Sequence, residues 1–161
     1  MIIAIDPSIN HIGFASLKSD GSFVSSRHIT PKKALKGNTL AKLNALFMEL
    51  QDELRKYPEA SEIIIEHTRF FARNNNSSHA SAQKLNIAKG MIYGVCRSTL
   101  SCPVHLAWLP GFGKDQANLL ARAHKLPKNI TQHERDAFWL GNSWATLPKA
   151  IKQAHLDNKD L

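Results

Sequence analysis

Four side chains in this sequence are of the types that bind divalent metal ions and promote phosphodiester hydrolysis. Asp6 and Glu66 each end a short apolar run, a position that presents an acid at one end of a β-sheet. His133 and Asp136 are spaced i and i+3, so on a helix they share one face. If adjacent strands bring the two strand-end acids together, their repulsion is costly unless a cation such as Mg²⁺ neutralises them.

Three acids and one imidazole suit two metal ions about 4 Å apart, which bind the attacking water and the leaving oxygen of a phosphodiester. Each residue alone also has an ordinary explanation. The two aspartates could form a turn or compensate a helix dipole, Glu66 could pair with a nearby arginine, and His133 could be a surface residue. Their joint occurrence favours a metal site.

The elements that position these residues follow from the apolar pattern. Strands are expected where apolar runs meet turn residues, and helices where apolar residues recur every three or four positions. The expected strands are 2–6, 12–17, 23–29, 61–66 and 103–109, and the expected helices are 39–57, 77–98, 114–125 and one from about 132. Thr131 and Glu134 form a Thr-x-x-Glu capping box, which fixes the start of the last helix. No repeat or linker indicates a second domain, so we expect one domain over 1–161 with a polar tail from about 149 that frays.

The bulk composition favours a nucleic-acid partner. The chain has 161 residues, 43% of them hydrophobic, with 21 Lys and Arg against 13 Asp and Glu, a net charge of +8. Such a basic domain suits a polyanion. The apolar runs are too short to span a membrane and no secretory signal is visible, so we expect a cytoplasmic protein. Cys96 and Cys102 have no metal-site or disulfide spacing and are expected to be small buried residues.

Three ordered motifs resemble the RuvC Holliday-junction resolvases of the RNase H-like superfamily. They are Ile2-Ile3-Ala4-Ile5-Asp6-Pro7-Ser8 with Gly13-Phe14-Ala15, Ile64-Ile65-Glu66 followed by Phe70-Phe71, and Lys125-Leu126-Pro127 leading to His133-Glu134-Arg135-Asp136-Ala137. The resemblance implies an α/β, RNase H-like fold with a five-stranded mixed sheet, its first three strands antiparallel, flanked by helices.

The resemblance also implies an activity. A protein of this family would be a Mg²⁺-dependent endonuclease that resolves four-way DNA junctions by paired symmetric nicks. Asp6, Glu66, His133 and Asp136 match the family's metal ligands, for two Mg²⁺ per subunit, with Mn²⁺ as a substitute. The protein would act as a homodimer with the helix 77–98 near the interface.

A basic and aromatic segment beside Glu66 is expected to contact DNA. One of its two phenylalanines would stack on an unpaired base, which is worth about 1–3 kcal/mol per base, while the other packs in the core. Lys89 and Arg122 are further candidates for phosphate contacts. The predicted DNA-binding residues are Arg69, Phe70, Phe71, Arg73, Asn74, Asn75, Lys84 and Lys114.

Departures from the family pattern leave alternatives open. Ser8 stands where the family usually has Gly, 108–114 is shorter than in typical bacterial members, and 73–78 is longer and Asn-rich. A compact, divergent member would suit a phage, with the host cytoplasm as its compartment. The alternatives are an RNase H-like nuclease that acts on RNA or an RNA–DNA hybrid, and a non-catalytic DNA-binding module. The loop 110–114 lacks phosphate-loop spacing, so no nucleotide cofactor is expected.

Overall fold

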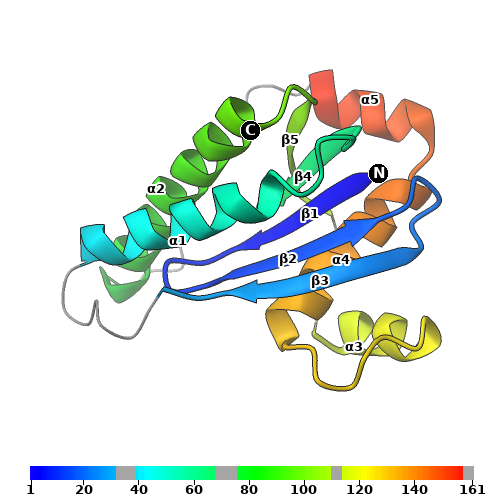
Figure 1. Ribbon diagram of the computed structural model, residues 1–161, viewed down its shortest axis with the longest axis horizontal. Helices are drawn as coiled ribbons and strands as arrows, with labels where there is room; N and C mark the ends of the chain where they lie inside the picture. The colour runs from blue at the N-terminus through cyan, green and yellow to red at the C-terminus, as the bar shows by residue number, and fades with distance from the viewer. Residues whose placement is uncertain (32–38, 68–75, 110–113, 158–161) are drawn as a thin grey trace.

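The computed structural model describes residues 1–31, 39–67, 76–109 and 114–157, in which five strands form one mixed sheet (Figure 1). The strands are β1 (Ile2–Pro7), β2 (Ile12–Leu17), β3 (Phe23–Ile29), β4 (Glu62–Glu66) and β5 (Val104–Ala107). The helices are α1 (Thr39–Leu54), α2 (Asn76–Thr99), α3 (Lys114–Ala123), α4 (Gln132–Thr146) and α5 (Lys149–Asp157).

The sheet has the order β3-β2-β1-β4-β5, with β1 at its centre. β1, β2 and β3 pair antiparallel, whereas β4 and β5 run parallel to β1. This is the five-stranded mixed sheet that the sequence predicted, so the predicted fold class is confirmed. Parallel pairing sets Ile5 against Ile65. The next residue of each strand, Asp6 and Glu66, therefore lies at the same end of the sheet.

Both faces of the sheet are covered by helices, and α1 and α2 form the layer on one face (Figure 1). Ile3 and Ile5 of β1 point into this layer, while Ile2 and Ala4 point to the opposite face. Because successive side chains of a strand alternate between faces, Asp6 shares the face of Ala4. Leu43, Phe47, Leu50 and Leu54 of α1 and Ala88 and Ile92 of α2 are buried in this layer, with the spacing of three and four residues expected of an inward helix face.

The opposite face is covered mainly by α4, which contacts β1, β2, β3 and β4. Phe138, Leu140 and Trp144 are buried there against Ala4, Leu17 and Ile64 in a second apolar cluster. α3 packs against α4 rather than directly on the sheet. This arrangement places the first turn of α4 beside the ends of β1 and β2.

The segment after Pro148, which we expected to fray, is helical over Lys149–Asp157. Its contacts are with α4. Lys152 Nζ donates a hydrogen bond to the Ala145 carbonyl at 3.4 Å and lies 5.7 Å from the Trp144 ring centroid. Cys96 is buried and Cys102 partly buried, both as free thiols. In the described ranges, no helix is long and apolar enough to cross a membrane.

Candidate metal centre

Side chains from β1 and α4 meet at the end of the sheet where Asp6 lies. The Asp6 carboxylate Oδ2 is 2.6 Å from Nδ1 of His133, although the two residues are 127 positions apart in the chain. Asp136 is one helical turn further along α4, and ligand atoms of Asp6, His133 and Asp136 all lie within 4.8 Å of one another. Both aspartates are buried, with 8% and 7% of their surface exposed. This is a donor set suited to a divalent cation.

Glu66 joins the group through Asp6. The two carboxyl groups lie close enough for a hydrogen bond when one of them carries a proton. Burial, the hydrogen bond with Asp6 and the negative charge of Asp6 raise the pKa of Glu66 to about 8. All four predicted ligands therefore lie at one end of the sheet, with Glu66 as a neighbour of Asp6 rather than a member of the three-ligand group.

The start of α4 is fixed by the predicted capping box. The Thr131 backbone N–H donates to Glu134 Oε2 at 2.8 Å, and the Glu134 N–H donates to Thr131 Oγ1 at 3.4 Å. Ser26 of β3 donates a further hydrogen bond to Glu134 Oε1 at 2.8 Å. The same carboxylate thus caps the helix and ties its first turn to the sheet, which fixes the direction of His133 and Asp136.

Gly13 allows α4 to approach the sheet closely. It pairs directly with Asp6 in the β1–β2 register. A Cβ atom at this position would lie 2.0 Å from the His133 carbonyl oxygen and 2.9 Å from the His133 Cβ. Any larger residue would therefore push the histidine away from Asp6.

Two further histidines lie against His133, and sequence reasoning missed both. The ring centroids of His11 and His133 are 4.0 Å apart, and the His28 ring stacks near His133 at 5.9 Å. Burial, followed by the nearby charges of His133 and His28, lowers the pKa of His11. His28 Nε2 is buried and has no hydrogen-bond partner among the described residues. A possible signal was the pairing of Gly13 with His28, but it appears only once the β2–β3 register is known.

The charges around the centre leave an excess of carboxyl groups. Burial raises the pKa of Asp136, and the hydrogen bond with Asp6 raises the pKa of His133. Lys89 of α2, expected as a phosphate contact, is instead only 4% exposed, and its charge acts on Glu66 and Asp6. These acids resist ionisation because their negative charges would repel one another. Their oxygen atoms and the His133 nitrogen are suitably spaced to bind a divalent cation, which would relieve this repulsion.

The predicted DNA-binding residues divide into two groups. Lys84 on α2 and Lys114 at the start of α3 are exposed, and the charge of Lys114 is felt by His133 and Asp136. The remaining residues lie outside the described part of the chain: Arg69, Phe70, Phe71, Arg73, Asn74 and Asn75.

No protein-family model and no curated protein matches this sequence, but solved structures match its fold. T. thermophilus RuvC in complex with Holliday junction substrate superposes with a TM-score of 0.68 at 16% identity, covering 98% of this chain and 96% of that chain. A further Thermus thermophilus RuvC structure gives 0.66 at 15%, covering 96% of both chains. The yeast mitochondrial Holliday junction resolvase Ydc2 gives 0.54 at 13%, covering 97% of this chain and 81% of the other. The chain has the RuvC-type, RNase H-like fold that the sequence resemblance implied.

Proposed function

We propose that this protein is a divalent-metal-dependent DNA endonuclease that cuts four-way junctions by paired symmetric nicks. The observation that carries the proposal is the convergence of Asp6, His133 and Asp136 ligand atoms within 4.8 Å, with the Glu66 carboxyl group beside Asp6. Two matched structures are described as RuvC with a junction substrate and as a Holliday junction resolvase, which favours the same class of substrate.

The residues at the sheet end have separate tasks in this mechanism. Asp6, Glu66, His133 and Asp136 would hold two Mg²⁺ ions, with Mn²⁺ as a substitute. When bound, such ions supply an activated water and stabilise the charge that develops on the phosphate. The chain itself contributes fixed positions, because the Thr131–Glu134 cap orients α4 and Gln132 Nε2 donates to Asp136 Oδ1 at 2.7 Å. The expected products carry 5′-phosphate and 3′-hydroxyl ends.

The surface of α2 supports a homodimer. Ile87, Gly90, Met91 and Gly94 follow the spacing of one helix face, here called the α2 stripe. Ile87 is 59% and Met91 38% exposed, and a Cβ atom added at either glycine would have no neighbour within 4 Å among the described residues. An exposed apolar stripe with two glycines suits close packing of a second helix. Two copies joined here would offer two centres to two strands of one junction.

The decisive test is a nicking assay with Mg²⁺ on a synthetic four-way junction, a linear duplex of the same sequence and an RNA–DNA hybrid. We expect paired symmetric nicks on the junction from the unchanged protein. Asp6→Asn should bind the junction without cutting it. Asp52→Asn is the matched control, because Asp52 is an exposed acid on α1 whose side chain is 68% accessible and pairs only with Arg55 among the described residues.

Each other result would redirect the proposal. Cleavage of the hybrid alone would still support the metal centre, but it would indicate an RNase H-like nuclease that acts on RNA–DNA hybrids instead of four-way junctions. Junction binding without cleavage by the unchanged protein would indicate a binding module. A monomer in solution, unaffected by Ile87→Glu, would contradict the dimer.

A further inference from the structure

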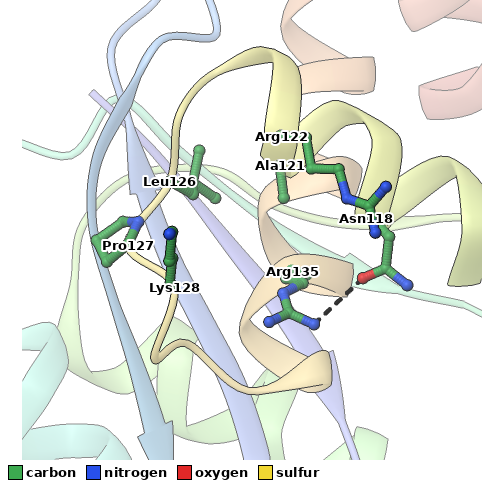
Figure 2. Close-up of a pocket in the computed structure, with 7 residues that line it drawn as sticks. All are labelled: Asn118, Ala121, Arg122, Leu126, Pro127, Lys128 and Arg135. Atoms are coloured by element: carbon green, nitrogen blue, oxygen red, sulfur yellow. Dashed lines mark hydrogen bonds between the residues drawn. The ribbon is translucent and has the colours of Figure 1, made fainter.

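A pocket lined by positively charged side chains lies against α4, on another face of the helix from the metal centre. A pocket of about 350 Å³ opens between α3, the turn that follows α3, and the first turns of α4 (Figure 2). Three of its lining residues are cationic: Arg122 from α3, Lys128 from the turn and Arg135 from α4. Three separate elements thus contribute one positive charge each to a single hollow.

The turn after α3 brings these charges together. Lys125 has a positive φ of 52°, and the Leu126 N–H donates to the Ala121 carbonyl at 2.9 Å while the Lys125 N–H donates to that of Arg122 at 3.0 Å. This hydrogen-bond pair is the Schellman arrangement, which reverses the chain at a helix end. The reversal returns Lys128 to the pocket that Arg122 lines (Figure 2).

The pocket is built but its charge is not neutralised. Arg135 is partly buried, and its Nη1 donates to Asn118 Oδ1 at 3.2 Å, an uncharged acceptor that orients the guanidinium. Within the described ranges, no carboxylate oxygen lies within 4.0 Å of a nitrogen of Arg122, Lys128 or Arg135. Clustered like charges repel, and an anion with several oxygens would relieve that repulsion through charge-assisted hydrogen bonds.

The place of the pocket relative to the metal centre indicates which anion. Arg135 immediately precedes Asp136, but a helix turns through about 100° per residue, so the two side chains leave α4 in different directions. A helix is about 10–12 Å wide, and a DNA strand carries one phosphate per about 3.4 Å along its axis. A strand with its scissile phosphate at the metal centre would therefore bring a phosphate a few nucleotides away to the pocket.

We propose that Arg122, Lys128 and Arg135 form a binding pocket for a backbone phosphate of the DNA, separate from the metal centre and a few nucleotides from the scissile phosphate. This inference rests on the proposed nuclease function. Arginine suits the role because its planar guanidinium donates two parallel hydrogen bonds to phosphate oxygens. The pocket would fix the register of the strand on α4 rather than take part in the chemistry.

The test measures junction and duplex binding at several salt concentrations with Mg²⁺ present, in the Asp6→Asn background so that the DNA stays intact. Arg122→Gln/Arg135→Gln should weaken binding about tenfold and reduce the slope of log affinity against log salt by about 0.9 for the one phosphate lost. Arg135→Lys, which keeps the charge, should restore part of the affinity. Arg55→Gln/Lys149→Gln is the matched control, because it removes the same charge from exposed positions outside the pocket.

An equal change of slope in the control pair would overturn the proposal, because net charge alone would then explain binding. An unchanged slope in the pocket variant would also overturn it. A lowered melting temperature with unchanged slope would assign the arginines a structural role. If millimolar inorganic phosphate stabilises the unchanged protein but not the pocket variant, while DNA binding is equal in both, the site takes free phosphate and not DNA. If the pocket variant shows the expected change of slope but the unchanged protein does not cut junctions, this inference stands and the proposed function is contradicted.

Discussion

Two glutamates that are both largely buried, Glu53 and Glu66, have opposite electrostatic surroundings. Burial by itself would raise the pKa of Glu53, but hydrogen bonds from Lys56, at 2.8 Å, and from Arg27 outweigh it and leave that pKa below its ordinary value. Glu66 has another carboxyl group as its hydrogen-bond partner, and its pKa is raised to about 8. Lys89 offsets only part of this effect.

The difference distinguishes a carboxylate that holds the fold from one that is prepared for a ligand. The cluster of Arg27, Glu49, Glu53 and Lys56 balances its own charges between β3 and α1. The cluster of Asp6, Glu66 and Asp136 does not, so folding concentrates repulsion there that a cation would remove. A carboxylate with a structural role finds its positive partner within the protein, as Glu53 does. Acids with strongly perturbed pKa values lack such a partner and are therefore typical of functional sites.

The largest expected effect is the contrast between Glu66→Gln and Glu53→Gln. Glu66→Gln should lower the single-turnover nicking rate on a four-way junction by about 10³-fold, since it removes a metal ligand and a charge at the reacting phosphate. Glu53→Gln should leave the rate unchanged and lower the free energy of unfolding by about 1.5–3 kcal/mol, through the loss of charged hydrogen bonds. Urea unfolding and nicking rates should be measured on both variants. A loss of nicking in Glu53→Gln, or a loss of stability without a loss of nicking in Glu66→Gln, would contradict the comparison.

The next effect concerns pH and metal together. Glu66 in the folded, metal-free protein keeps its proton up to about pH 8, whereas in the unfolded chain it loses it near its ordinary pKa of 4.5. The folded state therefore binds more protons in this window, so the stability of the metal-free protein should fall as pH rises from 5.5 to 7.5. His133, whose pKa is also raised, acts in the same direction, whereas His11, whose pKa is lowered, offsets part of the effect. Glu53, whose pKa is lowered, makes a contribution to stability that does not change with pH in this window.

Mg²⁺ should flatten that decline. At a hundred times its dissociation constant, a ligand that binds only the folded state stabilises it by about 2.7 kcal/mol. Melting temperatures in EDTA and in saturating Mg²⁺, at pH 5.5, 6.5 and 7.5, would show the two curves diverging as pH rises. Parallel curves would mean that the raised pKa of Glu66 has no connection with metal binding.

A smaller effect is expected from Lys89→Met, which removes a buried cation beside the acids. Without that competing charge, the affinity for Mn²⁺ or Mg²⁺ should rise about tenfold, the equivalent of about 1.4 kcal/mol. Lys84→Met provides the control, because Lys84 lies on the same helix but is exposed. Isothermal titration calorimetry of both variants would reveal whether affinity rises only for Lys89→Met; unchanged affinity would remove Lys89 from the electrostatics of the centre.

The smallest effect is expected at the helix cap. Thr131→Ala removes the hydroxyl that accepts from the Glu134 N–H and should cost about 1 kcal/mol of stability. Because Ser26 still holds Glu134 to β3, the position of α4 should change little, and nicking should fall less than tenfold. Thermal unfolding together with single-turnover rates would test this ranking; a loss of activity as large as that of Glu66→Gln would show that the cap, and not the acids, limits the reaction.

The sequence was informative where local rules decide the structure. The apolar runs of β1 and β4 predicted two strands that end in acids, and Thr131 with Glu134 predicted the start of α4. It was less informative where distant elements meet. His11, His28 and Lys89 approach the centre because of strand register and helix packing, which no short pattern encodes. α5 was missed because its nine residues are mostly polar and give only a short apolar pattern; among its contacts with α4 are those of Lys152.

The separation of 127 positions between Asp6 and His133 has a consequence for how the protein folds during its synthesis. Asp6 has no local partner in the centre: β1 and α4 must both be made and docked before Asp6 and His133 can meet. Contacts of such long sequence separation form slowly, because the intervening chain must be ordered first. A ribosome-bound chain that has not yet released α4 therefore cannot assemble the centre, which forms only after the residues of α4 have been made and have docked on the sheet.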